Sequence, residues 1–226
     1  IDILDSEFST EIENKVKSIF WVRDMVNFPA LTKSPDFFQH KVEELIEGLD
    51  INLKSYDQEW IKENNMGGVI GVSQGSDRPP KFLVGEYNTK AKKQIAFIGK
   101  GVLFDSGGLS LKSPAGMETM KTDMAGAATA WGIIALVAKE GLDIGLKVYT
   151  PIVENMPSGS AIRPGDILSM RNGKSIEVMN TDAEGRLIMA DALAYASESK
   201  PDIICDVATL TGAAYVALGV EIGAVF

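Results

Sequence analysis

The sequence contains very little cysteine and histidine. Among its 226 residues, Cys205 is the only cysteine and His40 the only histidine. A single cysteine excludes an internal disulfide, and the apolar neighbours of Cys205 favour a packed thiol over a reactive one. His40 lies in a stretch typical of a solvated helix, yet any hydrolase with a histidine base, or any HExxH zinc site, would depend on it. We therefore expect a metal site, if present, to be built from carboxylates.

Basic charge and long apolar runs are also scarce. The 22 lysines and arginines are outnumbered by 31 acidic residues, and the resulting net charge of -9 opposes broad attraction to nucleic acid. No apolar run approaches the roughly 20 residues that span a bilayer. The first residues, IDILDSEFST, lack the basic start and the apolar stretch of a secretory signal. We predict a cytoplasmic protein with no membrane partner and no nucleic-acid partner.

The first part of the chain has apolar residues at helical spacing. The pattern predicts a helix that ends near Asn27, a second from Pro35 to about Gly48 that Ser34 caps, and a short third one within 56–65. The glycine-rich stretch 66–76 does not match the G-x-G-x-x-G fingerprint of dinucleotide binding. The segment 80–93, which carries lysines, is expected to be a loop or hairpin.

From Gln94 onward the pattern changes to short apolar runs that alternate with segments of small residues. The runs predict strands within 94–105, 146–155, 175–180 and 202–210, and the other segments predict helices within 124–141 and 187–200. Such alternation predicts an α/β fold with three layers, α/β/α, in which helices flank a mixed, largely buried central sheet.

Acidic residues collect next to these predicted strands. Asp105 ends the first strand, which also contains Lys100, and Asp123 precedes a helix of small residues. Asp182 and Glu184 lie two residues apart and would point the same way in an extended backbone. Ligands of α/β sheets gather outside the carboxyl ends of the strands. Four carboxylates in one pocket would repel one another, so the pattern predicts two divalent cations between them.

Two metal ions about 3.5 to 4 Å apart share a water, lower its pKa and present hydroxide to a carbonyl group. Lys112, seven residues after Asp105, would supply positive charge to the developing oxyanion. The pattern therefore predicts metal-assisted hydrolysis. Each motif taken singly also fits a plainer role, because an Asp-Gly-Gly commonly forms a turn and a D-x-E-x-R commonly forms a surface ion pair. Their conjunction favours the hydrolytic site.

The octapeptide NTDAEGRL at 180–187 resembles the signature of the leucyl aminopeptidase family of dinuclear metallopeptidases. GKGVLFDSGGLSLK at 99–112, METMKTDMAGAA at 117–128 and DVATLTGA at 206–213 resemble its neighbouring motifs, in the same order and with similar spacing. WVRDMVNFPA at 21–30 resembles the start of the catalytic domain. The resemblance implies an enzyme that hydrolyses the N-terminal residue, preferably one like leucine, from peptides.

The resemblance also implies a role for each matching residue. The metal ligands would be Lys100, Asp105, Asp123, Asp182 and Glu184, with the lysine bound as a neutral amine. Lys112 would polarise the scissile carbonyl. Arg186 would hold a bicarbonate ion that serves as general base. The pocket for the side chain of the substrate would be lined by Met120, Thr209, Leu210 and Gly212.

The family further implies cofactors, an assembly and a domain division. Two divalent ions per subunit are expected, zinc or manganese, with magnesium or cobalt as alternatives, and the full-length form is expected to be a homo-hexamer. Residues 1–30 would be a connecting helix from an absent N-terminal domain, and 31–226 a catalytic domain that lacks its C-terminal part. Two other functions stay open: a non-catalytic scaffold, and a DNA-binding architectural protein, against which the acidic charge counts.

Overall fold

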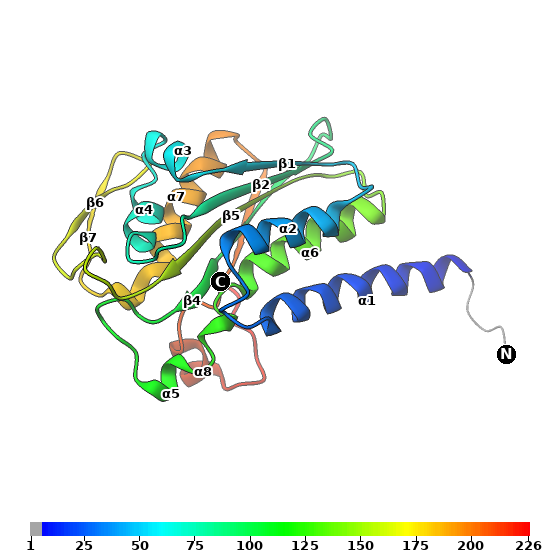
Figure 1. Ribbon diagram of the computed structural model, residues 1–226. Coiled ribbons are helices and arrows are strands. Elements are labelled where there is room, and N and C mark those ends of the chain that lie inside the picture. Colours follow the sequence, from blue (N-terminus) through cyan, green and yellow to red (C-terminus); the bar gives the residue numbers. More distant parts are fainter. Residues whose placement is uncertain (1–5) are drawn as a thin grey trace.

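Six strands form one mixed sheet in the computed structural model, which describes residues 6–226 (Figure 1). The strands are β1 (Ile51–Tyr56), β2 (Lys81–Tyr87), β3 (Gln94–Gly99), β4 (Gly101–Asp105), β5 (Gly145–Asn155) and β8 (Ile203–Val207). Their order is β1-β2-β5-β3-β8, and β4 also pairs with β5. The β1–β2 and β2–β5 pairs are antiparallel, whereas β3, β4, β5 and β8 run parallel.

The central strand β5 has eleven residues and carries two shorter strands in succession. Its first half pairs with β3, where Ile95 lies opposite Leu146, and its second half pairs with β4, where Val102 lies opposite Val153. The chain breaks its pairing at Lys100, between β3 and β4. One apolar run of the sequence thus becomes two strands, and their junction lies at the edge where the parallel strands end.

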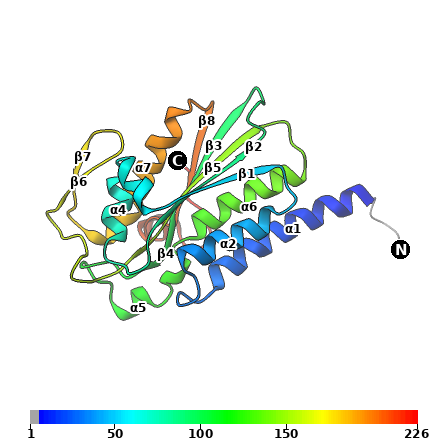
Figure 2. The same ribbon diagram turned by 45° about the horizontal axis from the view of Figure 1, so that its top comes forward.

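Three helices cover one face of the sheet (Figures 1 and 2). The helix α6 (Ala125–Lys139) packs directly on the strands, and α1 (Ser6–Asn27) and α2 (Pro35–Ile46) lie against it. Ser34 begins α2 as predicted, since its side chain accepts a hydrogen bond of 3.1 Å from the Phe37 N–H. The core beneath these helices includes Met25, Phe38, Val42, Leu103, Trp131, Ile134 and Val148.

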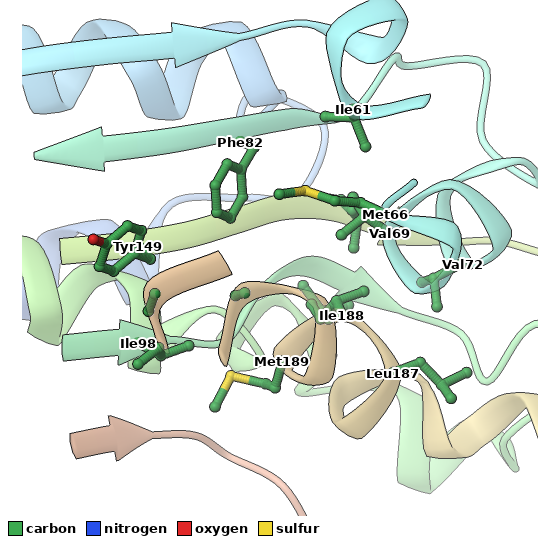
Figure 3. Close-up of a cluster of buried hydrophobic side chains, with 14 of the residues drawn as sticks. Ile61, Met66, Val69, Val72, Phe82, Ile98, Tyr149, Leu187, Ile188 and Met189 are labelled. Atoms are coloured by element: carbon green, nitrogen blue, oxygen red, sulfur yellow. The ribbon is translucent and has the colours of Figure 1, made fainter. Parts of the chain in front are cut away.

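The other face of the sheet is covered by α3 (Gln58–Glu63), α4 (Gly67–Ser73) and α7 (Glu184–Glu198). Figure 3 shows side chains of α4 and α7 that meet those of the strands in a second core, which includes Ile61, Met66, Val69, Phe82, Ile98, Tyr149 and Ile188. Most of the glycine-rich stretch 66–76 forms the helix α4. Its glycines permit close packing, because a Cβ at Gly68 would lie 2.4 Å from the Leu187 carbonyl oxygen of α7.

Short elements complete the fold. They are the hairpin of β6 (Ile167–Ser169) and β7 (Ser175–Glu177), the helices α5 (Pro114–Met117) and α8 (Ala213–Leu218), and the 3-10 turns η1 (Met120–Thr122) and η2 (Thr181–Ala183). Among the helices within residues 6–226, none has both the length and the apolar character needed to cross a membrane.

The predicted α/β class with a mixed sheet between helical layers is confirmed, and α1 ends at the predicted Asn27. The expectation of a loop or hairpin at 80–93 is wrong, because most of that segment is β2, between β1 and β5. Strand β2 is buried on both faces, so its residues KFLVGEY show no clean alternation, and the flanking prolines and lysines conceal it.

Lys33 is fully buried and fastens α1 to η1. Its Nζ donates hydrogen bonds to the carbonyl oxygens of Met25 at 2.9 Å and of Lys121 at 2.7 Å. Lys121 in turn donates to the Asn27 carbonyl at 2.8 Å. The bonds to Met25 and Asn27 satisfy carbonyl groups that the end of α1 leaves without helical partners. Burial, and secondarily the charge of Lys121, lowers the pKa of Lys33 to about 8.

Replacement of Lys33 by methionine should change how stability depends on pH. Because the folded pKa of about 8 lies below the ordinary 10.5, the unfolded chain binds more protons between these values, and the contribution of Lys33 to stability rises with pH across that interval. The rise should be of order 3 kcal/mol. Urea unfolding at pH 7.5 and pH 10 measures it as the difference between the unaltered chain and Lys33→Met. The same difference at both pH values contradicts the prediction, and Lys90→Met, on an exposed turn, is the control.

Candidate metal centre

The predicted site residues converge where the parallel strands end. Lys100 follows β3, Asp105 ends β4 and Thr209 lies just beyond β8. Asp123 directly follows η1, two residues before α6, and Glu184 is the first residue of α7. Ligand sites of α/β sheets form at this edge, and the positive ends of helix dipoles favour acidic groups there.

Lys100 lies at the centre of one half of the site, with 2% of its surface exposed. Its Nζ lies 2.7 Å from Asp123 Oδ1 and 2.9 Å from Glu184 Oε1, and donates to the Thr209 carbonyl at 3.0 Å. The Thr209 hydroxyl also donates to Asp123 Oδ1, at 2.8 Å. The lysine reaches this position because α7 passes very close: a Cβ at Gly185 would lie 2.5 Å from Lys100 Cε.

Asp105 is held by the turn that follows β4. Its Oδ1 accepts hydrogen bonds from the Gly107 N–H at 2.9 Å and from Asn155 Nδ2 at 2.8 Å. Gly107 and Gly108 have φ angles of 87° and 63°, a left-handed conformation that glycine adopts without steric cost. The turn brings Lys112 back, so that its Nζ lies 3.0 Å from Asp105 Oδ2.

The acids of NTDAEGRL do not lie on an extended backbone, and that expectation is wrong. Residues 181–183 form η2 and Glu184 starts α7, because Asn180 caps this turn by accepting from the Asp182 N–H at 2.8 Å. Asp182 and Glu184 nevertheless converge, and each places one oxygen within 4.8 Å of one from Asp105 and of the other. Arg186 points outward from the first turn of α7 and is exposed.

Asp182 joins the site through Lys112, whose Nζ lies 2.5 Å from Asp182 Oδ1. Lys112 is partly open to solvent, with 17% of its side chain exposed. Burial by itself would lower its pKa, but the hydrogen bonds that it donates to Asp182 and Asp105 outweigh burial and raise the pKa. Lys112 therefore carries a firm positive charge at the open side of the cluster.

The protein's own charges leave the buried acids incompletely satisfied. Burial raises the pKa of Glu184 to about 7 and that of Asp123 to about 6, despite the nearby Lys100. Burial opposes the charge of Lys100, but the carboxylates of Glu184 and Asp123 outweigh it and raise the pKa of the lysine. Asp123 Oδ2 and Glu184 Oε2 are buried with no hydrogen-bond partner. Unpartnered buried carboxylate oxygens are costly, and hard divalent cations are suited to them, so this donor set fits metal ions.

The residues expected to line a substrate pocket are less closely connected to the acids. Thr209 touches Asp123 and Lys100, whereas Met120 is only partly buried in η1, and Leu210 and Gly212 are exposed beyond β8. Asn155 and Thr181 were not among the predicted site residues, yet both are buried and both form hydrogen bonds with the loops that carry the acids. Their only sequence signal is position: Asn155 ends a strand and Thr181 precedes Asp182.

The protein is therefore an α/β protein with a mixed sheet. Carboxylates and two lysines gather where the parallel strands end and form a candidate metal centre. A family model described as the cytosol aminopeptidase family, catalytic domain, matches residues 20–226. The chain belongs to this family.

Individual relatives agree with the family match. A protein named probable cytosol aminopeptidase from Syntrophotalea carbinolica is 48% identical over 206 residues, which are 90% of this chain and 41% of that protein. The solved cytosol aminopeptidase from Coxiella burnetii is 37% identical, with a TM-score of 0.91 over 96% of this chain and 47% of its own. A bottromycin maturation enzyme, BotP, solved in complex with Mn, is 37% identical with a TM-score of 0.88, over 93% of this chain and 47% of its own. The chain thus spans less than half the length of these three proteins.

Mn²⁺ is expected to raise the melting temperature of the chain more at pH 7.5 than at pH 5. Without ions, the contribution of Asp123 and Glu184 to stability is full below their ordinary pKa values of 3.8 and 4.5 and is lost as pH rises through 6 and 7. Cations favour the deprotonated groups, so protons compete with Mn²⁺ at pH 5. Thermal melts with and without Mn²⁺ at both pH values measure the effect.

The control for this experiment is Glu86→Gln, which removes a carboxylate that pairs with Lys54 and Lys147 on the sheet, away from the site. This variant should keep the full pH dependence of the Mn²⁺ effect. A Mn²⁺ effect of equal size at pH 5 and pH 7.5 in the unaltered chain would show that these two acids are not the ligands.

Proposed function

We propose that this chain is the catalytic part of a metal-dependent aminopeptidase, which hydrolyses the N-terminal residue from peptides. The observation that carries the proposal is the buried group of acids with two unpartnered oxygens, on Asp123 and Glu184, in a chain of the cytosol aminopeptidase family. A structural ion-pair cluster would have no reason to leave these oxygens unsatisfied.

The site would hold two divalent ions through Lys100, Asp105, Asp123, Asp182 and Glu184. Lys100 would have to lose its proton to act as a ligand. The neighbouring carboxylates now keep it protonated, and two cations bound among them would reverse this local field and favour the neutral amine. Manganese is the metal we favour, because the related BotP was solved with Mn, and zinc, magnesium and cobalt are the alternatives. When bound, the ions would act as Lewis acids on the scissile carbonyl and on the attacking water.

The role we assign to Lys112 follows from its charge and its position. Asp105 and Asp182 hold its ammonium group at the edge of the cluster, where part of it meets solvent. Its raised pKa keeps it protonated at neutral pH. A fixed positive charge beside the reacting carbonyl would stabilise the negative charge that develops on the carbonyl oxygen.

Arg186 would hold a bicarbonate ion that accepts the proton of the attacking water. It is exposed on the first turn of α7, two residues after Glu184, and its guanidinium forms no hydrogen bond or ion pair with the residues that the structure describes. Both the helix N-terminus and the guanidinium favour an anion there. A leucine-like side chain would be preferred, with Met120, Thr209, Leu210 and Gly212 around it.

We extend the proposal to the assembly and the location of the whole protein. A homo-hexamer of the full-length form and a cytosolic location follow the family, whose relatives are named cytosol aminopeptidases. In this proposal 1–30 connects to a further domain and 31–226 forms the catalytic domain. A non-catalytic scaffold has no observation in its favour, and neither has a DNA-binding role, which the net charge of -9 opposes.

Lys112→Ala is expected to retain Mn²⁺ and to lose most of its turnover of leucine-p-nitroanilide, by about 100-fold or more in kcat. Lys112 stabilises charge that develops during the reaction, so the rate should fall more than the metal content. The measurement is kcat with Mn²⁺ together with the number of ions bound per chain. Asp182→Ala should lose both metal and activity.

The matched control is Lys90→Ala, which removes an exposed lysine outside the site and should leave turnover and metal content unchanged. A Lys112→Ala chain that loses metal but keeps its turnover per bound ion would contradict the role assigned to Lys112. An unaltered chain that binds Mn²⁺ and hydrolyses no N-terminal residue would favour the scaffold.

A further inference from the structure

Asn155 is the last residue of β5 and lies between two loops that carry the candidate ligands. Only 2% of its surface is exposed. Its Nδ2 donates one hydrogen bond to Asp105 Oδ1 at 2.8 Å and another to the Thr181 carbonyl at 3.0 Å. One amide group thus joins the turn after β4 to the segment that carries Asp182 and Glu184.

The backbone of Asn155 holds the same turn from a second side. Its carbonyl oxygen accepts hydrogen bonds from the Ser106 N–H at 3.0 Å and from Ser106 Oγ at 2.7 Å. Asp105 lies opposite Asn155 in the β4–β5 pairing, after an irregularity in the register that begins at Val102. The side chain and the backbone of Asn155 therefore fix both the position and the direction of Asp105.

The consequence for Asp105 is that its two oxygens have different surroundings. Oδ1 accepts hydrogen bonds from both Asn155 Nδ2 and the Gly107 N–H. Oδ2 is left to face Lys112. These bonds restrict rotation of the Asp105 carboxylate. Its Oδ2 is therefore already oriented for binding a metal ion.

Thr181 connects the same two loops independently of Asn155. Its hydroxyl donates to the Gly107 carbonyl at 2.6 Å and accepts from the Ser110 N–H at 2.8 Å. Unlike Thr181, the amide of Asn155 bonds directly to a candidate ligand, Asp105, as well as to the other loop. An aspartate there would present oxygen to two acceptors, and a leucine would offer no donor to either.

We propose that Asn155 is a positioning residue for the metal centre, which holds Asp105 and the Asp182–Glu184 segment in their metal-binding arrangement. The proposal rests on the proposed function, since it requires that these acids bind a divalent ion. Asn155 acts through Asp105 and Thr181 and has no contact of its own with substrate in this role.

The test is the Mn²⁺ affinity of the chain, measured by calorimetric titration, for the unaltered chain and for Asn155→Leu and Asn155→Ala. Loss of an outer partner of a metal ligand weakens affinity by about 10- to 100-fold, and we expect Asn155→Leu to fall in this range. Asn155→Ala leaves room for a water and should lose less. It also provides the answer if the bulkier leucine prevents folding.

The control is Thr150→Val, five residues earlier on β5. Thr150 is also buried, and its hydroxyl accepts from Trp131 Nε1 at 3.0 Å without touching any candidate ligand. This variant should lose thermal stability and keep the Mn²⁺ affinity of the unaltered chain, so it separates loss of stability from loss of positioning.

Two results overturn the proposal in different ways. If the unaltered chain binds Mn²⁺ and both Asn155 variants bind it equally well, Asn155 has only a structural role, while the proposed function stands. If the unaltered chain does not bind Mn²⁺ at all, the proposed function fails, and the positioning role fails with it.

Discussion

The convergence of four carboxylates, three of them buried, at one edge of a sheet is the constraint on which the rest of this structure depends. Two lysines offset part of their charge, yet Asp123 and Glu184 each keep a buried oxygen without a partner. Such a cluster is expensive for a protein to maintain, because both desolvation and like-charge repulsion oppose it. Metal ions would remove both costs, which links the stability of the site to its proposed chemistry.

The sheet makes this burial possible by supplying rigid attachment points. Strands β3, β4, β5 and β8 run parallel and all end at the site, so their last residues are set by backbone pairing. The helices α6 and α7 begin at the same edge, on opposite faces of the sheet. Each comes close to the strand ends because it has a glycine at the contact, Gly126 in α6 and Gly185 in α7. Side chains fixed on strands and helix ends hold their geometry better than side chains on free loops, as a metal site requires.

The class of fold was predictable from local pattern, and the same pattern pointed to acids that the fold brings together. The helical spacing before residue 66 and the alternation after Gln94 gave the layers, and all five candidate ligands lie in one cluster. Strand β2 was missed because it is buried on both faces and carries no alternation. The backbone of 181–184 was predicted as extended, and a two-residue spacing of acids cannot distinguish that from a helix start capped by Asn180.

The sequence by itself determined which chemical groups this protein has available: abundant carboxylates, one histidine, one cysteine, and motifs that resemble those of one family. Only the tertiary structure decided how they are arranged, namely that Lys100 pairs with Asp123 and Glu184, and that Lys112 pairs with Asp105 and Asp182. It also revealed Asn155, whose amide joins residues that lie 50 and 26 positions away. The physical reason is that such contacts arise from the pairing of distant strands, and local residue patterns carry no record of which strands will meet.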